Sequence, residues 1–189
     1  MSAGDLKEKY LPRLLSLYQE QIVAGMKEKF GYTNKLAVPR LVKIVVNMGI
    51  GEGTSDSKLV DKASEELALI TGQKAKITRA RKPISNFKLR KGAPIGCCVT
   101  MRRYRMYEFL DRLITVAIPR IRDFRGFSGN AFDGNGNYTF GLLEQSVFAE
   151  VEIDKVSRTQ GMNISIHTTA KTDEEAKELL KLFGFPVRR

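Results

Sequence analysis

The stretch from Leu67 to Tyr107 contains no aspartate or glutamate, and this constrains the chain more than any other feature of its sequence. The net charge of +11 lies entirely within it, because the rest of the chain holds 21 basic and 21 acidic residues. Cations that repel one another stay at the surface, where a polyanion can neutralise them and release its counterions. The sequence therefore predicts a surface that binds nucleic acid. The cations are Lys74, Lys76, Arg79, Arg81, Lys82, Lys88, Arg90, Lys91, Arg102, Arg103 and Arg105.

Length and composition predict one compact domain. The chain has 189 residues, 42% of them hydrophobic and 28% charged, which suits a globular protein with a buried core. It has no apolar run long enough to span a membrane, and its first residues are polar and charged, so a secretory signal is not expected. The only cysteines, Cys97 and Cys98, are adjacent, and with the single His167 they offer no metal-ligand set. We expect a cytoplasmic protein without a metal or other cofactor.

Apolar periodicity predicts an α+β fold, in which helices pack on one face of an antiparallel or mixed sheet. Helical spacing covers residues 5–30, 56–70, 107–117 and 173–183. Strand-like alternation covers residues 41–48, 75–78, 95–103, 147–153 and 162–169. We expect residues 1–189 to form a single domain, with a protruding basic loop at about 79–94 and a glycine-rich loop at about 125–141.

Motifs of nucleotide binding and catalysis are weak. Gly49, Gly51 and Gly53 follow a strand in a GxGxG spacing, whereas a dinucleotide site needs GxGxxG, so a tight strand-to-helix turn is the favoured interpretation. His167 lies on an alternating strand, where a polar sheet-face residue is commoner than a catalytic base. We expect a binding protein and no enzyme. An RNA-modifying or tRNA-processing enzyme that uses the same basic face is the alternative.

Two of the expected strands divide their residues between a packed face and an open face. The packed face holds Val42, Ile44, Val46, Cys97, Val99 and Met101. The open face holds Lys43, Asn47, Thr100 and Arg102. Lysine and arginine can meet phosphates there, while asparagine and threonine can bond ribose hydroxyls, which suits the shallow minor groove of RNA. Phe87, in the basic loop, serves either as a tether to the core or as a platform for base stacking.

Five segments carry a family resemblance that runs from about residue 5 to residue 186. They read LVKIVVNMGIGE, ITGQKAKITRARKPISNFKLRKGAPIGCCVTMRRYRMYEFLDRLI, IPRIRDFRGF, FDGNGNY and TTAKTDEEAKELL. Together they resemble the bacterial large-subunit ribosomal protein L5 family, which holds 5S rRNA in the central protuberance. The resemblance implies a single α+β domain with a mainly antiparallel sheet, helices packed on one face and an open, basic, concave face opposite. It implies a structural protein of the cytoplasmic ribosome, in contact with 5S rRNA, 23S rRNA and neighbouring large-subunit proteins. It also implies contacts with peptidyl-site tRNA and with a protein of the small-subunit head.

The resemblance also assigns roles to individual positions. Family positions credited with 5S rRNA contact match Asn47, Gln73, Phe87 and Thr100, beside the basic Lys43, Lys74 and Arg102. The loop from Pro83 to Gly92 is implied to reach the tRNA elbow through Lys88, Arg90 and Lys91. This chain has Cys98 where the family commonly has lysine. If that lysine neutralises a phosphate, its loss makes the logarithmic salt dependence of binding shallower by about 0.9.

Overall fold

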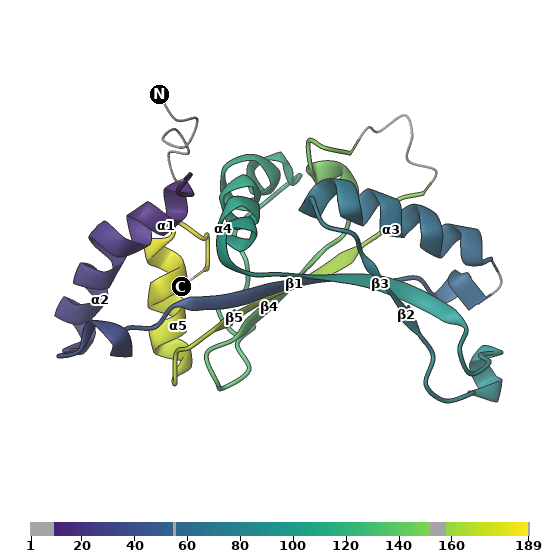
Figure 1. The fold of residues 1–189 in the computed structure, drawn as a ribbon, viewed down its shortest axis with the longest axis horizontal. Coiled ribbons are helices and arrows are strands. Elements are labelled where there is room, and N and C mark those ends of the chain that lie inside the picture. Colours follow the sequence, from purple (N-terminus) through teal and green to yellow (C-terminus); the bar gives the residue numbers. More distant parts are fainter. Residues whose placement is uncertain (1–9, 55, 152–157, 189) are drawn as a thin grey trace, which may run out of the picture.

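A five-stranded antiparallel sheet organises the molecule, with strand order β2–β3–β1–β5–β4 (Figure 1). The computed structural model describes residues 10–54, 56–151 and 158–188. The strands are β1 (Leu41–Gly49), β2 (Lys76–Arg79), β3 (Pro94–Met101), β4 (Tyr138–Leu142) and β5 (Met162–Thr168). The predicted α+β class and the antiparallel arrangement are confirmed.

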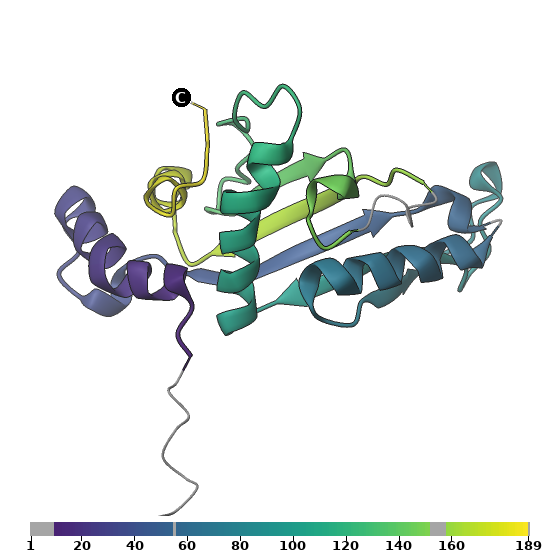
Figure 2. The same cartoon turned by 90° about the horizontal axis from the view of Figure 1, so that it is seen from above.

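Helices pack on the sheet and extend past its end. They are α1 (Arg13–Leu17), α2 (Val23–Phe30), α3 (Ser57–Thr71), α4 (Arg103–Arg112) and α5 (Asp173–Leu182). Figures 1 and 2 show α3 and α4 on the same side of the sheet, with α4 crossing the strands. A π-helical turn at Tyr18–Ile22 joins α1 to α2, and a second at Leu113–Ala117 prolongs α4.

The helix ends follow local sequence signals. Gly31 and Gly72 end α2 and α3 in the left-handed conformation, with φ of 69° and 65°, where glycine avoids the strain of a side chain. The Asp56 carboxylate accepts a hydrogen bond from the Lys58 amide at the start of α3. Thr172 caps α5 in the same way, through the Glu175 amide. These ends agree with the sequence prediction.

The core lies between the sheet and the helices. Ile44, Val46 and Met48 of β1 are fully buried, and so are Ile164 and Ile166 of β5. Val42 departs from the predicted packed face, since it is 42% exposed while Leu41 is buried. The β1–β5 register shifts between Leu41 and Lys43, and this irregularity exchanges the faces at the start of the strand.

Some predicted elements and bounds differ from the structure. The strand expected at 147–153 is a short 3₁₀ turn (Gln145–Val147) and bends through residue 151, while residues 152 and 153 lie outside the described part. The buried Gln145 amide holds this segment by donating to the Arg158 carbonyl at 2.7 Å. The glycine-rich loop ends before Tyr138, where β4 begins, and α4 starts at Arg103 instead of residue 107.

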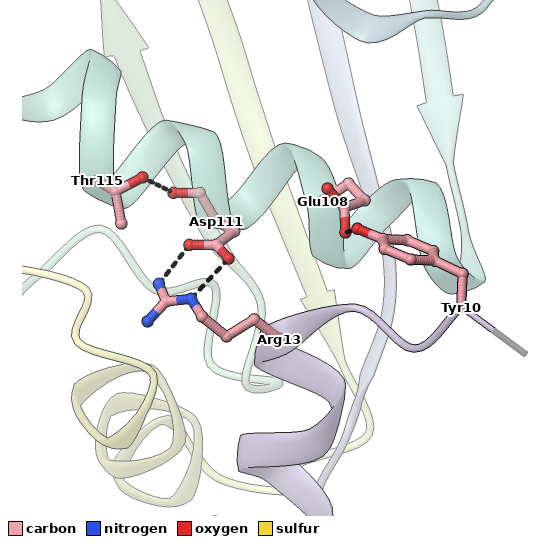
Figure 3. A network of polar contacts seen from close by, with 5 residues as sticks. All are labelled: Tyr10, Arg13, Glu108, Asp111 and Thr115. Carbon is pink, nitrogen blue, oxygen red and sulfur yellow. Dashed lines mark hydrogen bonds and ion pairs between the residues drawn. The ribbon is translucent and has the colours of Figure 1, made fainter. Parts of the chain in front are cut away.

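The N-terminal helix is fixed to α4 by polar contacts (Figure 3). Arg13 donates from Nε to the Asp111 carboxylate at 2.9 Å, and the Tyr10 hydroxyl donates to Glu108. Thr115 closes the group by donating to the Asp111 backbone carbonyl at 2.7 Å. The residues of the helix predicted at 5–30 that precede Tyr10 lie outside the described part of the chain.

Candidate nucleic-acid interface

A polar row crosses the whole sheet on the face opposite α3 and α4. Its members are successive cross-strand partners: Lys76, Cys98, Asn47, Asn163 and Gly141. The chain neighbours of these residues on β1, β3 and β5 are buried in the core, so alternation directs the row away from it. The row joins the predicted Asn47 to residues of four other strands.

A second row lies beside the first. It comprises Thr100, Val45, Ser165 and Thr139, paired in that order across four strands. The Thr139 hydroxyl donates to the Ser165 hydroxyl at 3.0 Å. These hydroxyls give the β5 and β4 side of the face the same ribose-bonding chemistry as the β3 side.

His167 stands opposite Lys43 at the β1–β5 pairing. Burial lowers the pKa of the imidazole and the Lys43 ammonium lowers it further, while Asp133 opposes the shift. The ring is therefore neutral at physiological pH. This agrees with the interpretation of His167 as a polar sheet-face residue.

Gln73 and Arg102 extend the face at the end of β3. The Gln73 amide donates to the Thr100 carbonyl at 3.4 Å, which holds the turn after α3 against the strand. Lys74, the next residue, is exposed. Arg102 is also exposed and follows Met101, whose partner is Ile44, so it lies at the strand end next to Lys43. The structure thus brings together the predicted Lys43, Asn47, Gln73, Thr100 and Arg102.

All eleven cations of the acid-free stretch are exposed. Among the described residues, no ion pair involves any of them. Cations elsewhere in the chain do find carboxylates from distant segments, as Lys29 does with Glu178 at 2.6 Å and Arg112 does with Glu150. Within the described residues, ion pairs therefore do not neutralise the charge of the basic stretch.

The segment between β2 and β3, residues 80–93, forms an arm on the side of the sheet opposite α3 (Figure 1). Ala80 and Ala93 extend the β2–β3 pairing with a 2.9 Å hydrogen bond. Two hydrogen bonds of 3.0 Å join Ile84 and Leu89 near the tip. Between them a 3₁₀ turn (Ser85–Phe87) leads into Lys88, which has a φ of 50°.

Phe87 is 72% exposed on this arm, so it is no tether to the core. Lys88, Arg90 and Lys91 are exposed on the same short turn. The structure thus groups Phe87 with the predicted tRNA-contacting cations on the arm and leaves the other 5S rRNA candidates on and beside the sheet.

Four residues of the face were missed by the sequence prediction: Lys76, Thr139, Asn163 and Ser165. Alternation within residues 162–169 already separates polar from apolar positions, and that signal marks Asn163 and Ser165. The pairing of β1 with β5, which brings these side chains beside Asn47, could not be predicted from the sequence.

The glycine-rich turn after β1 is closely packed against neighbouring residues. A Cβ on Gly53 would lie 2.4 Å from Val60 Cγ2 and 3.0 Å from the Pro94 carbonyl oxygen. The turn itself is a 3₁₀ helix, Gly51–Thr54, that leads into α3. The favoured interpretation, a tight strand-to-helix turn, agrees with this geometry.

The two cysteines are free and differ in environment. Cys97 is fully buried, and burial raises the pKa of its thiol to about 11. Cys98 is half-buried on the opposite, polar face. Across the described residues, no group of three or more histidine, cysteine, aspartate or glutamate side chains could hold a metal ion. No described helix is both long and apolar enough to cross a membrane.

A cleft of about 490 Å³ lies beside the edge strand β4, and its lining residues come from outside the basic stretch. Four arginines line it: Arg120, Arg122, Arg125 and Arg188. Leu143, on its rim, is 89% exposed. This combination of an apolar side chain and arginines is typical of protein contact surfaces.

Comparisons with known proteins cover nearly the whole chain. Residues 34–90 match the family model described as Ribosomal protein L5, and residues 94–187 match the model of the C-terminus of the same ribosomal family. A large ribosomal subunit protein uL5 from Kocuria rhizophila is 58% identical over 95% of both chains. The protein of the same name from Thermobifida fusca is 58% identical over 94% of this chain and 93% of its own. The one from Geotalea uraniireducens is 56% identical over 94% and 99%.

Proposed function

The chain belongs to the ribosomal protein L5 family of structural, non-enzymatic large-subunit proteins, and we propose that it holds 5S rRNA on the open face of its sheet. Membership makes it a constituent of the large subunit of the cytoplasmic ribosome, with ribosomal RNA as partner. It also removes the enzyme alternative, because the family acts by binding.

The observation that carries the proposal is the polar row from Lys76 through Cys98 and Asn47 to Asn163. Neutral groups occupy the middle of the face, where ribose hydroxyls and base edges of an RNA minor groove would lie. Exposed cations stand at its margin, where phosphates would lie. A face of this kind recognises an RNA helix by shape and leaves the bases paired.

The arm supports a contact with peptidyl-site tRNA. Its exposed cations, Lys88, Arg90 and Lys91, lie at one turn, and the pairing of Ile84 with Leu89 gives that turn a defined geometry. An arm that extends away from the sheet can reach a second RNA while the sheet holds the first. Phe87 offers that turn an aromatic surface for base stacking.

A bridge to the small-subunit head requires a protein-binding surface outside the RNA face. The cleft beside β4 fits this requirement, because exposed Leu143 can enter an apolar pocket while Arg120 and Arg122 meet carboxylates. The supporting observation is its separation from the basic stretch along the chain.

Filter binding of 5S rRNA across a salt series tests the central proposal. The double variant Asn47→Ala, Arg102→Ala removes a ribose-bonding amide and one phosphate-binding cation. We expect weaker binding and a logarithmic salt slope that is shallower by about 0.9 for the lost phosphate contact. Lys58→Gln, on α3, loses the same charge outside the face and is the matched control. Equal affinity for the double variant and the wild type would refute the sheet face as the 5S rRNA site.

A further inference from the structure

We propose that the first turn of α4 carries a further RNA-binding surface, distinct from the sheet face and the arm, which contacts an RNA phosphate backbone while the open sheet face is occupied. The surface, called the α4 patch here, consists of Arg103, Tyr104 and Arg105. It goes beyond the proposed function, because it lies on the helix layer, on neither the open sheet face nor the arm.

The chain leaves the open face immediately before the patch. Thr100 lies on that face, Met101 is buried in the core, and Arg102 returns to the open side by alternation. Arg103 then adopts a left-handed conformation with a φ of 53°, and the chain turns into α4. Since Met106 and Tyr107 of α4 are buried, its first turn belongs to the layer on the opposite side of the sheet. Figure 2 shows this end of α4 beside the chain that leads into α1.

The patch combines charge with an aromatic ring. Arg103 and Arg105 are both exposed, and Tyr104, between them in sequence, is 42% exposed. Arginine pairs with phosphate through its planar fork of donors, and an exposed tyrosine can stack on a nucleotide base. This chemistry favours RNA over a carboxylate-rich protein, which offers nothing for the ring to stack on.

The carboxylates nearest to the patch along α4 are occupied. Glu108 accepts from the Tyr10 hydroxyl, and Asp111 is bound by Arg13, as Figure 3 shows. Among the described residues, neither Arg103 nor Arg105 forms an ion pair. The N-terminal segment therefore takes up the acidic groups of α4 and leaves the arginines of its first turn to an external anion.

The conformation of Arg103 provides a variant that separates binding from folding. A non-glycine residue at a φ of 53° is strained, and glycine adopts this conformation without a steric cost. Arg103→Gly thus removes a cation from the patch and relieves strain in the same step. We expect the variant to have a melting temperature no lower than that of the wild type. Loss of RNA binding would then not come from unfolding.

The test measures binding of a second RNA to a preformed complex. Protein saturated with unlabelled 5S rRNA is titrated with a fluorescein-labelled RNA duplex of unrelated sequence, followed by anisotropy. The parent protein and the variants made from it all carry Lys88→Gln, Arg90→Gln and Lys91→Gln, which weakens binding at the arm. We expect the double variant Arg103→Gly, Arg105→Gln to bind the duplex roughly eightfold more weakly for each lost phosphate contact at 0.1 M salt. Its affinity for 5S rRNA should stay within about twofold, and Lys58→Gln should change neither measurement.

Three outcomes would overturn the proposal. The double variant could bind the duplex as tightly as its parent, which is also the result expected of a patch that meets a protein. The duplex could displace 5S rRNA, or the double variant could lose 5S rRNA binding to the same extent, and either result would mean one continuous RNA surface. If wild-type protein bound no 5S rRNA, the proposed function would fail instead. In that case the free protein would be titrated with the duplex, and the double variant should still bind it more weakly than its parent.

Discussion

Asn47 on β1 and Cys98 on β3 are direct cross-strand partners on the sheet face opposite α3 and α4. Lys76 is the next partner beyond Cys98, so the thiol stands between an amide and an ammonium group. Directly paired side chains in an antiparallel sheet lie close enough to share one ligand. A single substitution at position 98 therefore changes the middle of the candidate 5S rRNA site.

Cys98→Lys should restore a cation to this row. We expect the logarithmic salt slope of 5S rRNA binding to become steeper by about 0.9, and affinity at 0.1 M salt to rise roughly eightfold. The new charge would lie opposite Lys76, and we expect the free protein to lose about 0.2–1 kcal/mol of stability. Filter binding and thermal melts measure the two effects. Cys98→Gln, a neutral polar replacement, is the control, and an unchanged slope for Cys98→Lys would show that position 98 meets no phosphate.

The two thiols should react at very different rates. Burial raises the pKa of Cys97 to about 11. At mildly alkaline pH this thiol therefore stays protonated in the folded state, and it is also shielded from solvent. We expect a thiol reagent at mildly alkaline pH to modify Cys98 in the native protein and both cysteines after denaturation. Saturating 5S rRNA should protect Cys98. Reaction of Cys98 at the same rate with and without bound RNA would place the RNA elsewhere.

The same raised pKa of Cys97 couples folding to pH. In the unfolded chain this thiol loses its proton near its ordinary pKa of 9.0, whereas the folded state keeps the proton up to about 11. The stabilisation is complete below pH 9 and is lost as the pH rises towards 11, by at most about 1.4 kcal/mol per pH unit. Denaturant unfolding of the wild type and Cys97→Ala across this range should show a shallower pH dependence in the variant. Parallel curves would contradict the assignment.

The arm should contribute to tRNA binding independently of the sheet. A deletion of Pro83–Gly92 would remove Phe87, a 5S rRNA candidate, together with the cations, so charge-neutral substitutions are sharper. Lys88→Gln, Arg90→Gln and Lys91→Gln together keep the arm and its Ile84–Leu89 pairing. We expect the isolated 5S rRNA complex to form normally while ribosomes assembled with the variant lose peptidyl-site tRNA faster. Equal loss of both activities would mean that the arm belongs to the 5S rRNA site, and Phe87→Ala tests that residue separately.

Gly53→Ala should destabilise the fold without touching RNA affinity. The added Cβ would overlap Val60 and crowd the Pro94 carbonyl, and overpacking of this kind costs about 1–3 kcal/mol. Thermal or denaturant unfolding measures the loss. Gly49→Ala is the matched control, since a Cβ there meets no atom within 4 Å. A variant as stable as the wild type would show that the turn can relax and that packing does not select this glycine.

The charge segregation, the class of fold and most helix and strand positions could be predicted from the amino-acid sequence. These depend on local information: alternation, helical spacing and end signals such as Asp56, Gly31 and Gly72 act within a few residues. The family-level resemblance added the identity of the RNA partner, which periodicity does not contain.

The set of polar residues that share a face could not be predicted in this way, because it depends on strand pairing. Pairing of β1 with β5 brings Asn163 beside Asn47, although 116 positions separate them in the chain. The irregularity at Val42 likewise depends on the pairing of β1 with β5, far away in sequence. Alternation predicts which face of its own strand a side chain lies on. Long-range packing chooses the neighbouring strand, and for that reason the full width of the candidate interface is visible only in the folded chain.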